Sequence, residues 1–312
     1  MVDMSVSIGG MTLANPVMPG SGTFGEGMAK VIDLNLLGAI VSKTITHDVR
    51  EGNPPPRIAE FRDATLFSIG IPSKGADHYV NELVPFYRGY VPPLIASISA
   101  DTIEGFADLA ARISVPGVMA IEANVSCPNI KKDGQAFGMD ADATEQVVRA
   151  MKAATQVPVW AKLTPNAGNM AAVARAAERG GADALVAANA MLAMAIDVDT
   201  FRPKVANLMG GITGRATKPI ILRMAYQCAQ AVSIPVIGCG GIADANDALE
   251  YMLAGCSAVQ IGTASFISPN AMPRIINDLE AFCQRRGISR IRDLIGAMQM
   301  FEPVMLERRA TL

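Results

Sequence analysis

Eight short runs rich in β-branched residues alternate along the 312-residue chain with alanine-rich segments whose apolar residues recur at helical spacing. This alternation is typical of β-α units that pack helices around a parallel sheet. Because eight such units close into a ring, the pattern predicts a single (β/α)8 TIM barrel. The predicted strands cover about residues 16–20, 38–44, 93–98, 118–124, 157–163, 183–188, 234–238 and 257–262.

Helical patterns fill the connections between these strands, at 102–113, 141–155, 169–180, 218–232 and 244–254. Asp101 and Asp140 are expected to cap two of these helices, and the Gly180-Gly181 pair to end a third. The alternative architecture is a doubly wound open sheet, which carries a GxGxxG turn after its first strand. Here the glycine-rich turns come late in the chain and no GxGxxG opens a β-α unit, so the barrel is favoured.

Composition excludes several classes of protein. The chain has 27 basic and 29 acidic side chains and no dense run of Lys or Arg, which argues against a nucleic-acid binder. Its apolar runs are too short to span a membrane, and its first residues do not form a secretory signal. The five cysteines are odd in number and contain no CxxC pair, so neither a disulfide scaffold, a metal site nor a self-held iron–sulfur cluster is expected. A cytoplasmic protein is the natural interpretation.

Two connections are longer than a barrel needs. A barrel of about 250 residues leaves roughly 60 residues over, and we expect 1–312 to form one domain with this surplus in 45–92 and 190–217. Both segments follow the carboxyl end of a strand, the face where barrel enzymes build their active sites. The first holds six of the sixteen aromatic residues, for which packing or an interface is favoured over substrate contact: Phe61, Phe67, Tyr79, Phe86, Tyr87 and Tyr90.

Glycine-rich turns follow the seventh and eighth predicted strands. They read Gly238-Cys239-Gly240-Gly241-Ile242 and Gly262-Thr263-Ala264. Barrels often bind phosphate with these two loops, and glycines let backbone amides approach an anion without a Cβ in the way. Either turn alone could be ordinary turn chemistry, but together they predict a phosphate site.

Polar residues end the remaining strands, where hydrophobic runs stop. Lys43 and Lys162 end the second and fifth strands, and a lysine facing a barrel mouth needs an anionic or electron-rich partner. One such lysine could be a solvated rim charge. Two lysines converging with Asn124, Asn129 and Asn189 favour a functional site.

Cys127 is the most pointed candidate for chemistry, because it lies in a polar loop between two asparagines. A thiol there could act as a base or nucleophile, although a lone cysteine is more often a buried filler. Cys228 has helical spacing with apolar neighbours and is expected in the core. His47 and His78 lie in the first long connection, away from any triad pattern, and are interpreted as structural.

Several motifs together resemble one family. NVSCPN at 124–129, GQAFG at 134–138, SKT at 42–44, AKLTPN at 161–166, GCGGI at 238–242 and QIGTA at 260–264 are similar to the catalytic subunits of class 1B dihydroorotate dehydrogenases. The motifs occur in family order over nearly the whole chain. The resemblance implies an FMN-dependent oxidoreductase of CH–CH bonds that converts dihydroorotate to orotate in pyrimidine biosynthesis.

The resemblance also implies roles for individual residues. Cys127 would be the catalytic base, taking a proton while hydride leaves the neighbouring carbon for flavin N5. Asn124, Asn129 and Asn189 would hydrogen-bond the pyrimidine ring. The implied cofactor-binding residues are Ser21, Lys43, Thr44, Lys162, Gly214, Gly240, Gly241, Gly262 and Thr263.

The sequence departs from the family on the substrate side. Phe67 replaces an asparagine that helps hold the orotate carboxylate in the stretch that includes Gly70, and Ala190 replaces a Thr or Ser after Asn189. Losing a hydrogen bond to a charged group costs about 1.5–3 kcal/mol, although Lys43 offers a counter-charge. Three hypotheses stay open: a dihydroorotate dehydrogenase with an altered carboxylate subsite, a relative acting on another cyclic amide or activated alkene, and a flavin-storing subunit without catalysis.

Electron transfer to a nicotinamide would need another polypeptide, because the chain has no nicotinamide fingerprint and no cluster-type cysteine set. In class 1B relatives an FAD- and iron–sulfur-containing subunit supplies this route, and the catalytic subunits form homodimers. The resemblance implies both partners here.

Overall fold

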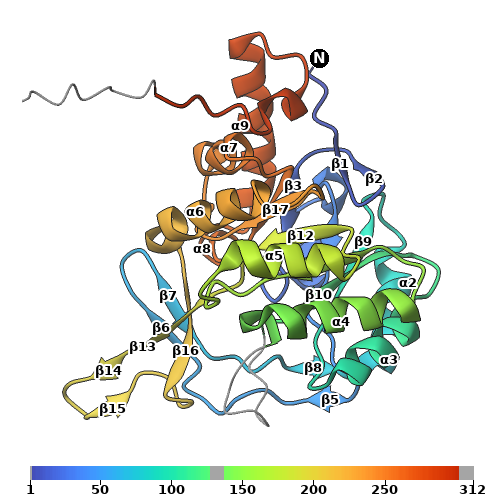
Figure 1. The fold of residues 1–312 in the computed structure, drawn as a ribbon. Helices are drawn as coiled ribbons and strands as arrows, with labels where there is room; N and C mark the ends of the chain where they lie inside the picture. The colour runs from blue at the N-terminus through green and yellow to red at the C-terminus, as the bar shows by residue number, and fades with distance from the viewer. Residues whose placement is uncertain (1, 127–136, 302–312) are drawn as a thin grey trace, which may run out of the picture.

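The computed structural model describes residues 2–126 and 137–301, and its centre is an eight-stranded parallel barrel (Figure 1). The strand order around it is β3-β18-β17-β12-β11-β10-β9-β4. All eight predicted strands are confirmed: β3 (Val17–Pro19), β4 (Ile40–Val41), β9 (Leu94–Ile98), β10 (Val118–Asn124), β11 (Val159–Lys162), β12 (Ala184–Ala187), β17 (Val236–Cys239) and β18 (Ala258–Ile261).

The ring closes where β3 meets β4. The backbone N–H of Gly38 donates to the Val17 carbonyl at 2.8 Å, just before β4 begins. A Cβ at residue 38 would lie 2.0 Å from the Asn15 carbonyl oxygen, so only glycine permits this approach. The strands are buried on both faces, as expected for a parallel sheet covered by helices.

Helices cover the outside of the barrel, and each buries one apolar face. They are α3 (Ile103–Ile113), α4 (Ala141–Ala154), α5 (Met170–Arg179), α6 (Lys218–Ala229), α7 (Ala245–Leu253), α8 (Ala264–Ile267) and α9 (Ala271–Arg286), with short turns η1 (Glu26–Lys30), η2 (Leu34–Leu36), η4 (Phe137–Met139), η5 (Arg215–Thr217) and η6 (Ile291–Leu294). Among these helices and turns, none is both long and apolar enough to cross a membrane.

The predicted helix ends are largely confirmed. Asp140 caps α4 by accepting the Ala143 N–H at 2.8 Å, and α5 ends at Gly180. The prediction that Asp101 caps α3 is wrong. Thr102 takes that place, because its hydroxyl oxygen accepts the Gly105 N–H at 2.9 Å.

A hairpin covers the amino end of the barrel. It consists of β1 (Val6–Ile8) and β2 (Met11–Leu13), with Gly9 in its turn. A Cβ on Gly9 would lie 3.0 Å from Trp160 Nε1, so the turn packs against the start of β11. The carboxyl ends of the strands therefore form the face where a site can be built.

The two long connections pair with each other. They form a four-stranded antiparallel sheet, here called the excursion sheet, in which Phe67 lies opposite Gly211. Figure 1 shows it extending away from the barrel. Its strands, in sheet order, are β13 (Met191–Met194), β16 (Met209–Thr213), β7 (Thr65–Phe67) and β6 (Ile58–Glu60), with small pairs β14 (Ile196–Asp197) with β15 (Arg202–Pro203) and β5 (Val49–Arg50) with β8 (Ser73–Lys74) nearby.

The last part of 45–92 differs from a surface excursion. Residues 75–87 form a continuous helical run of α1 (Gly75–His78), η3 (Tyr79–Leu83) and α2 (Val84–Tyr87) between β4 and β9. Tyr79 and Tyr87 are buried in this run, so packing is confirmed for these two aromatics, whereas Phe61 and Phe86 are exposed. Only the earlier part of the segment contributes to the excursion sheet.

Candidate active site

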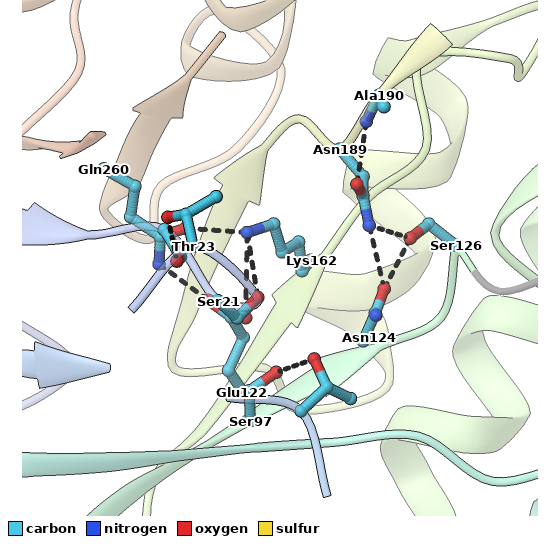
Figure 2. Close-up of polar contacts among 12 residues, drawn as sticks. Ser21, Thr23, Ser97, Glu122, Asn124, Ser126, Lys162, Asn189, Ala190 and Gln260 are labelled. Atoms are coloured by element: carbon cyan, nitrogen blue, oxygen red, sulfur yellow. Dashed lines mark hydrogen bonds and ion pairs between the residues drawn. The ribbon is translucent and has the colours of Figure 1, made fainter. Parts of the chain in front are cut away.

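The ammonium of Lys162 is buried at the carboxyl end of a barrel strand. Lys162 is the last residue of β11, and its side chain is only 3% exposed. Its Nζ donates to Gln260 Oε1 at 2.8 Å and to Ser21 Oγ at 3.1 Å (Figure 2). Glu122 Oε1 lies 3.8 Å from the same nitrogen. The predicted lysine is therefore a buried charge, and its contacts come from β18, from β10 and from the residues after β3.

Two glycines after β17 lie in close contact with the end of the second excursion and with α6. Gly240 and Gly241 have φ of +155° and +68°. A Cβ on Gly241 would lie 2.7 Å from the Gly214 carbonyl oxygen, and one on Gly240 would lie 2.7 Å from Ile221 Cγ2. The three predicted glycines therefore lie in a closely packed region that has no room for a Cβ at residues 240 and 241. The Tyr251 hydroxyl donates to the Gly240 carbonyl at 2.7 Å.

The turn after β18 lies against the end of the first strand. The Gly20 N–H donates to the Ile261 carbonyl at 2.8 Å, beside Gly262. The hydroxyls of Thr263 and Thr213 lie 2.8 Å apart, which ties this turn to the last strand of the second excursion. The structure thus brings both glycine turns together with the excursion sheet, as a phosphate site requires.

Lys43 and Thr44 follow β4 on the same face. The Thr44 hydroxyl is buried and lies 3.0 Å from the Ser97 hydroxyl. Burial lowers the pKa of the Lys43 ammonium. Among residues 2–126 and 137–301, no carboxylate forms an ion pair with Lys43 and no group accepts a hydrogen bond from its ammonium. A partly buried cation of this kind suits an anionic or electron-rich ligand.

Two asparagines form an amide cluster with a serine. Asn189 Nδ2 donates to Asn124 Oδ1 at 3.1 Å and to Ser126 Oγ, and the Ser126 hydroxyl also donates to Asn124 Oδ1 (Figure 2). The Ala190 N–H donates to Asn189 Oδ1 at 2.8 Å. Both amide oxygens are therefore used, and among residues 2–126 and 137–301 no acceptor is recorded for the Asn124 NH₂ group. That group could donate only to a hydrogen-bond acceptor.

The two departures from the family pattern lie side by side. A Cβ on Gly211 would lie 2.6 Å from Ala190 Cβ and 3.4 Å from Phe67 Cζ. Phe67 and Ala190 therefore flank one glycine of β16, where the excursion sheet meets the end of β12. The lost polar groups belong to one apolar contact rather than to two separate sites. Gly70, with φ of +80°, lies next to Asn53 in the turn that follows β7.

Sequence reasoning missed four residues that shape this face. Each of them contacts a predicted site residue: Glu122 and Gln260 contact Lys162, Ser126 contacts Asn189, and Asn166 contacts Ala190. Asn166 also joins Thr164 to the start of β13. A signal was available, since Glu122, Asn124 and Ser126 are spaced two apart along β10 and its continuation, and strand residues two apart share a face. Cys127 and Asn129 lie outside the described residues. Cys228 is buried, as predicted, and burial raises the pKa of its thiol to about 12.

Comparison with known proteins gives a consistent result. The family model for dihydroorotate dehydrogenase matches residues 3–283. The chain is 44% identical over 301 residues to the dihydroorotate dehydrogenase B (NAD(+)) catalytic subunit of Thermoanaerobacter sp. (strain X514), covering 96% of this chain and 100% of that one. It is 45% identical over 301 residues to the subunit of the same name from Geobacter sulfurreducens, covering 96% and 99%.

A solved structure agrees with the fold. The crystal structure of DHODH from Eimeria tenella in complex with ferulenol superposes with a TM-score of 0.76 at 22% sequence identity, covering 95% of this chain and 88% of that chain. With the family model spanning most of the chain and relatives above 40% identity, the barrel and its polar mouth are those of the dihydroorotate dehydrogenase family, to which this chain belongs.

Proposed function

We propose that this chain is the FMN-binding catalytic subunit of a class 1B dihydroorotate dehydrogenase, acting as one domain over 1–312 in pyrimidine biosynthesis. The observation that carries the proposal is the convergence of Lys162, Lys43 and the Asn124 amide at the carboxyl ends of the barrel strands. Similarity to the catalytic subunits over 96% of the chain supports it.

The residues present fit FMN. Gly240 and Gly241 form a partly exposed turn after β17 in which any Cβ would collide, and a glycine turn at this place in a barrel suits a phosphate. Lys43 is a half-buried cation without a described partner. FMN, when bound, supplies the hydride acceptor. The residues proposed to hold it are Gly214, Gly240, Gly241, Gly262 and Thr263 at the phosphate, and Ser21, Lys43, Thr44 and Lys162 along the ribityl chain and ring.

The chain's own groups position the substrate and move a proton. Asn124 presents NH₂ donors, which suit a pyrimidine carbonyl, and Asn189 holds that orientation by donating to Asn124 Oδ1. Asn129 is proposed as a further ring contact. Cys127 is proposed as the base that takes the proton from the carbon next to a substrate carbonyl.

The proposal keeps dihydroorotate as the substrate although the substrate side of the site differs from the family pattern. Phe67 and Ala190 present apolar groups where the family usually has polar ones, beside Gly211. Lys43 remains as a counter-charge for the dihydroorotate carboxylate. Neither the geometry nor the relatives favour a different reaction, and dihydroorotate therefore stays the proposed substrate, bound with Gly70 in the adjacent turn.

Two protein partners belong to the proposal. Exposed apolar side chains on and beyond β13, including Leu192 at 58%, Val198 at 75% and Phe201 at 86%, support a homodimer surface. The relatives are named as catalytic subunits of an NAD(+) enzyme, which supports a second, FAD- and iron–sulfur-containing subunit. Free thiols at Cys228, Cys256 and Cys283 suit a reducing cytoplasm.

Flavin titration and steady-state kinetics test the function. The purified chain should bind FMN in a one-to-one ratio and oxidise dihydroorotate with an artificial electron acceptor. FMN binding without dihydroorotate oxidation, together with activity on a cyclic amide that lacks the carboxylate, would contradict the proposed substrate. Stoichiometric binding of FMN with no activity on either would contradict the catalytic role.

A further inference from the structure

A buried carboxylate lies beneath the ammonium of Lys162. Glu122 on β10 has no exposed surface, and its Oε1 lies 3.8 Å from Lys162 Nζ. It shares a face of the strand with Asn124, two positions further along, so it points into the barrel below the amide cluster. Lys162 and Glu122 therefore form a charged pair inside the barrel, below its mouth.

Gln260 links the two charges with one defined orientation of its amide. Its Oε1 accepts from Lys162 Nζ at 2.8 Å, and its Nε2 donates to Glu122 Oε2 at 2.6 Å (Figure 2). An ammonium can only donate and an ionised carboxylate can only accept, so the opposite orientation would break both bonds. Glu122 thereby keeps the Gln260 oxygen turned toward Lys162.

Stability alone does not account for the carboxylate. Glu122 Oε1 has no hydrogen-bond partner among the described residues, and the group is fully buried. A buried ion pair is often no more stabilising than an apolar pair of the same size. A group that is costly to bury and lies directly under a proposed cofactor lysine is better explained by an effect on that lysine.

We propose that Glu122 is a positioning residue that fixes Lys162 through Gln260 and lowers the reduction potential of the bound flavin. This rests on the proposed function, in which Lys162 lines FMN. A cation beside the flavin favours its reduced, anionic form, and a carboxylate next to that cation offsets part of the effect. Removing the carboxylate charge therefore makes the flavin easier to reduce.

The test is the midpoint potential of the FMN-loaded protein, measured against reference dyes. Glu122→Gln keeps the side-chain size and removes the charge. It should increase the ratio of affinities for reduced and oxidised FMN about tenfold, a positive shift of about 30 mV for a two-electron couple. In a Lys162→Met background the same substitution should give a clearly smaller shift. An unchanged or more negative potential, or an equal shift in both backgrounds, would overturn the inference.

A second variant tests the bridge. Gln260→Met removes the amide and keeps both charges, so Lys162 should move toward Glu122 and the potential should become more negative, opposite to Glu122→Gln. If either variant fails to fold, the sign of the shift in the other decides. Glu104→Gln, on the exposed first turn of α3, is the matched control and should leave the potential unchanged. A wild-type chain that binds no FMN would defeat the proposed function, whereas normal FMN binding with unmoved potentials would defeat only this inference.

Discussion

Lys162 and Phe67 mark two regions at the carboxyl ends of the barrel strands that are held in different ways. Lys162 ends a buried parallel strand, and its Nζ is fixed by donating hydrogen bonds to Gln260 on β18 and to Ser21 after β3. Phe67 lies in an antiparallel sheet that two distant segments build together, and its neighbours are a glycine and an alanine. The group formed by Lys162, Glu122 and Gln260, here called the barrel floor, is polar and buried, whereas the excursion sheet is apolar and partly exposed. The floor is thus suited to hold a cofactor and the sheet to select what approaches it.

The largest effect is expected at Cys127, the proposed base. Cys127→Ser should lower kcat for dihydroorotate oxidation by about 10²–10⁴-fold, because a hydroxyl is a poor base near neutral pH. FMN affinity should stay unchanged. The check is steady-state kinetics over a pH series, since the residual activity should rise with pH. Unchanged kcat would reject Cys127 as the base.

In the barrel floor, Lys162→Met should destabilise the FMN-free protein by about 3–5 kcal/mol, because it leaves Glu122 as a buried charge without its partner. Urea unfolding of the FMN-free protein measures this directly. The double variant Lys162→Met/Glu122→Gln should recover part of the loss. No recovery would show that the two charges do not act as a pair.

One substitution made in both regions sharpens the comparison. Gly241→Ala places a Cβ 2.7 Å from the Gly214 carbonyl oxygen, and Gly211→Ala places one 2.6 Å from Ala190 Cβ. Each should cost about 1–3 kcal/mol of stability from overpacking. Gly241→Ala should weaken FMN binding with little change in substrate KM, and Gly211→Ala the reverse. If each variant changed FMN affinity and substrate KM equally, the proposed division of roles between the barrel floor and the excursion sheet would be wrong.

Within the excursion sheet, Phe67→Asn should lower KM for dihydroorotate by about ten- to a hundredfold, because an amide can donate to the substrate carboxylate where a phenyl ring cannot. FMN affinity should not change. The same assay on Phe67→Leu is the control, since leucine is apolar and should not lower KM. A raised KM in the asparagine variant would exclude Phe67 from the carboxylate subsite.

The smallest effect concerns Lys43. Burial lowers the pKa of Lys43 in the folded state, so the charged form destabilises the fold at neutral pH, and this cost is relieved as pH rises through the lowered pKa toward 10.5. Lys43→Met should therefore stabilise the FMN-free protein slightly at pH 7, by less than about 1 kcal/mol, with the gain fading at high pH. Thermal unfolding at several pH values measures this, and a gain that grows with pH would contradict it.

Much of the barrel could be predicted because each strand and helix carries its own local pattern. The strand ends at Lys162 and Gly240 followed from the same pattern, since carboxyl ends of parallel strands meet at one face. The pairing of β7 with β16 could not be predicted, because it joins segments more than 140 residues apart without a local signal. The contact of Glu122 with Gln260 could not be predicted for the same reason, since the two residues are 138 positions apart. The predicted cap of α3, Asp101, was wrong by one position, because the neighbouring Thr102 can make the same capping hydrogen bond.

The most direct test of the account is anaerobic mixing of the FMN-loaded chain with dihydroorotate while the flavin absorbance is recorded. We predict that the oxidised flavin band bleaches and that one orotate appears per flavin reduced. If dithionite bleaches the flavin but dihydroorotate at millimolar concentration does not, the barrel binds the cofactor and the proposed reaction is wrong.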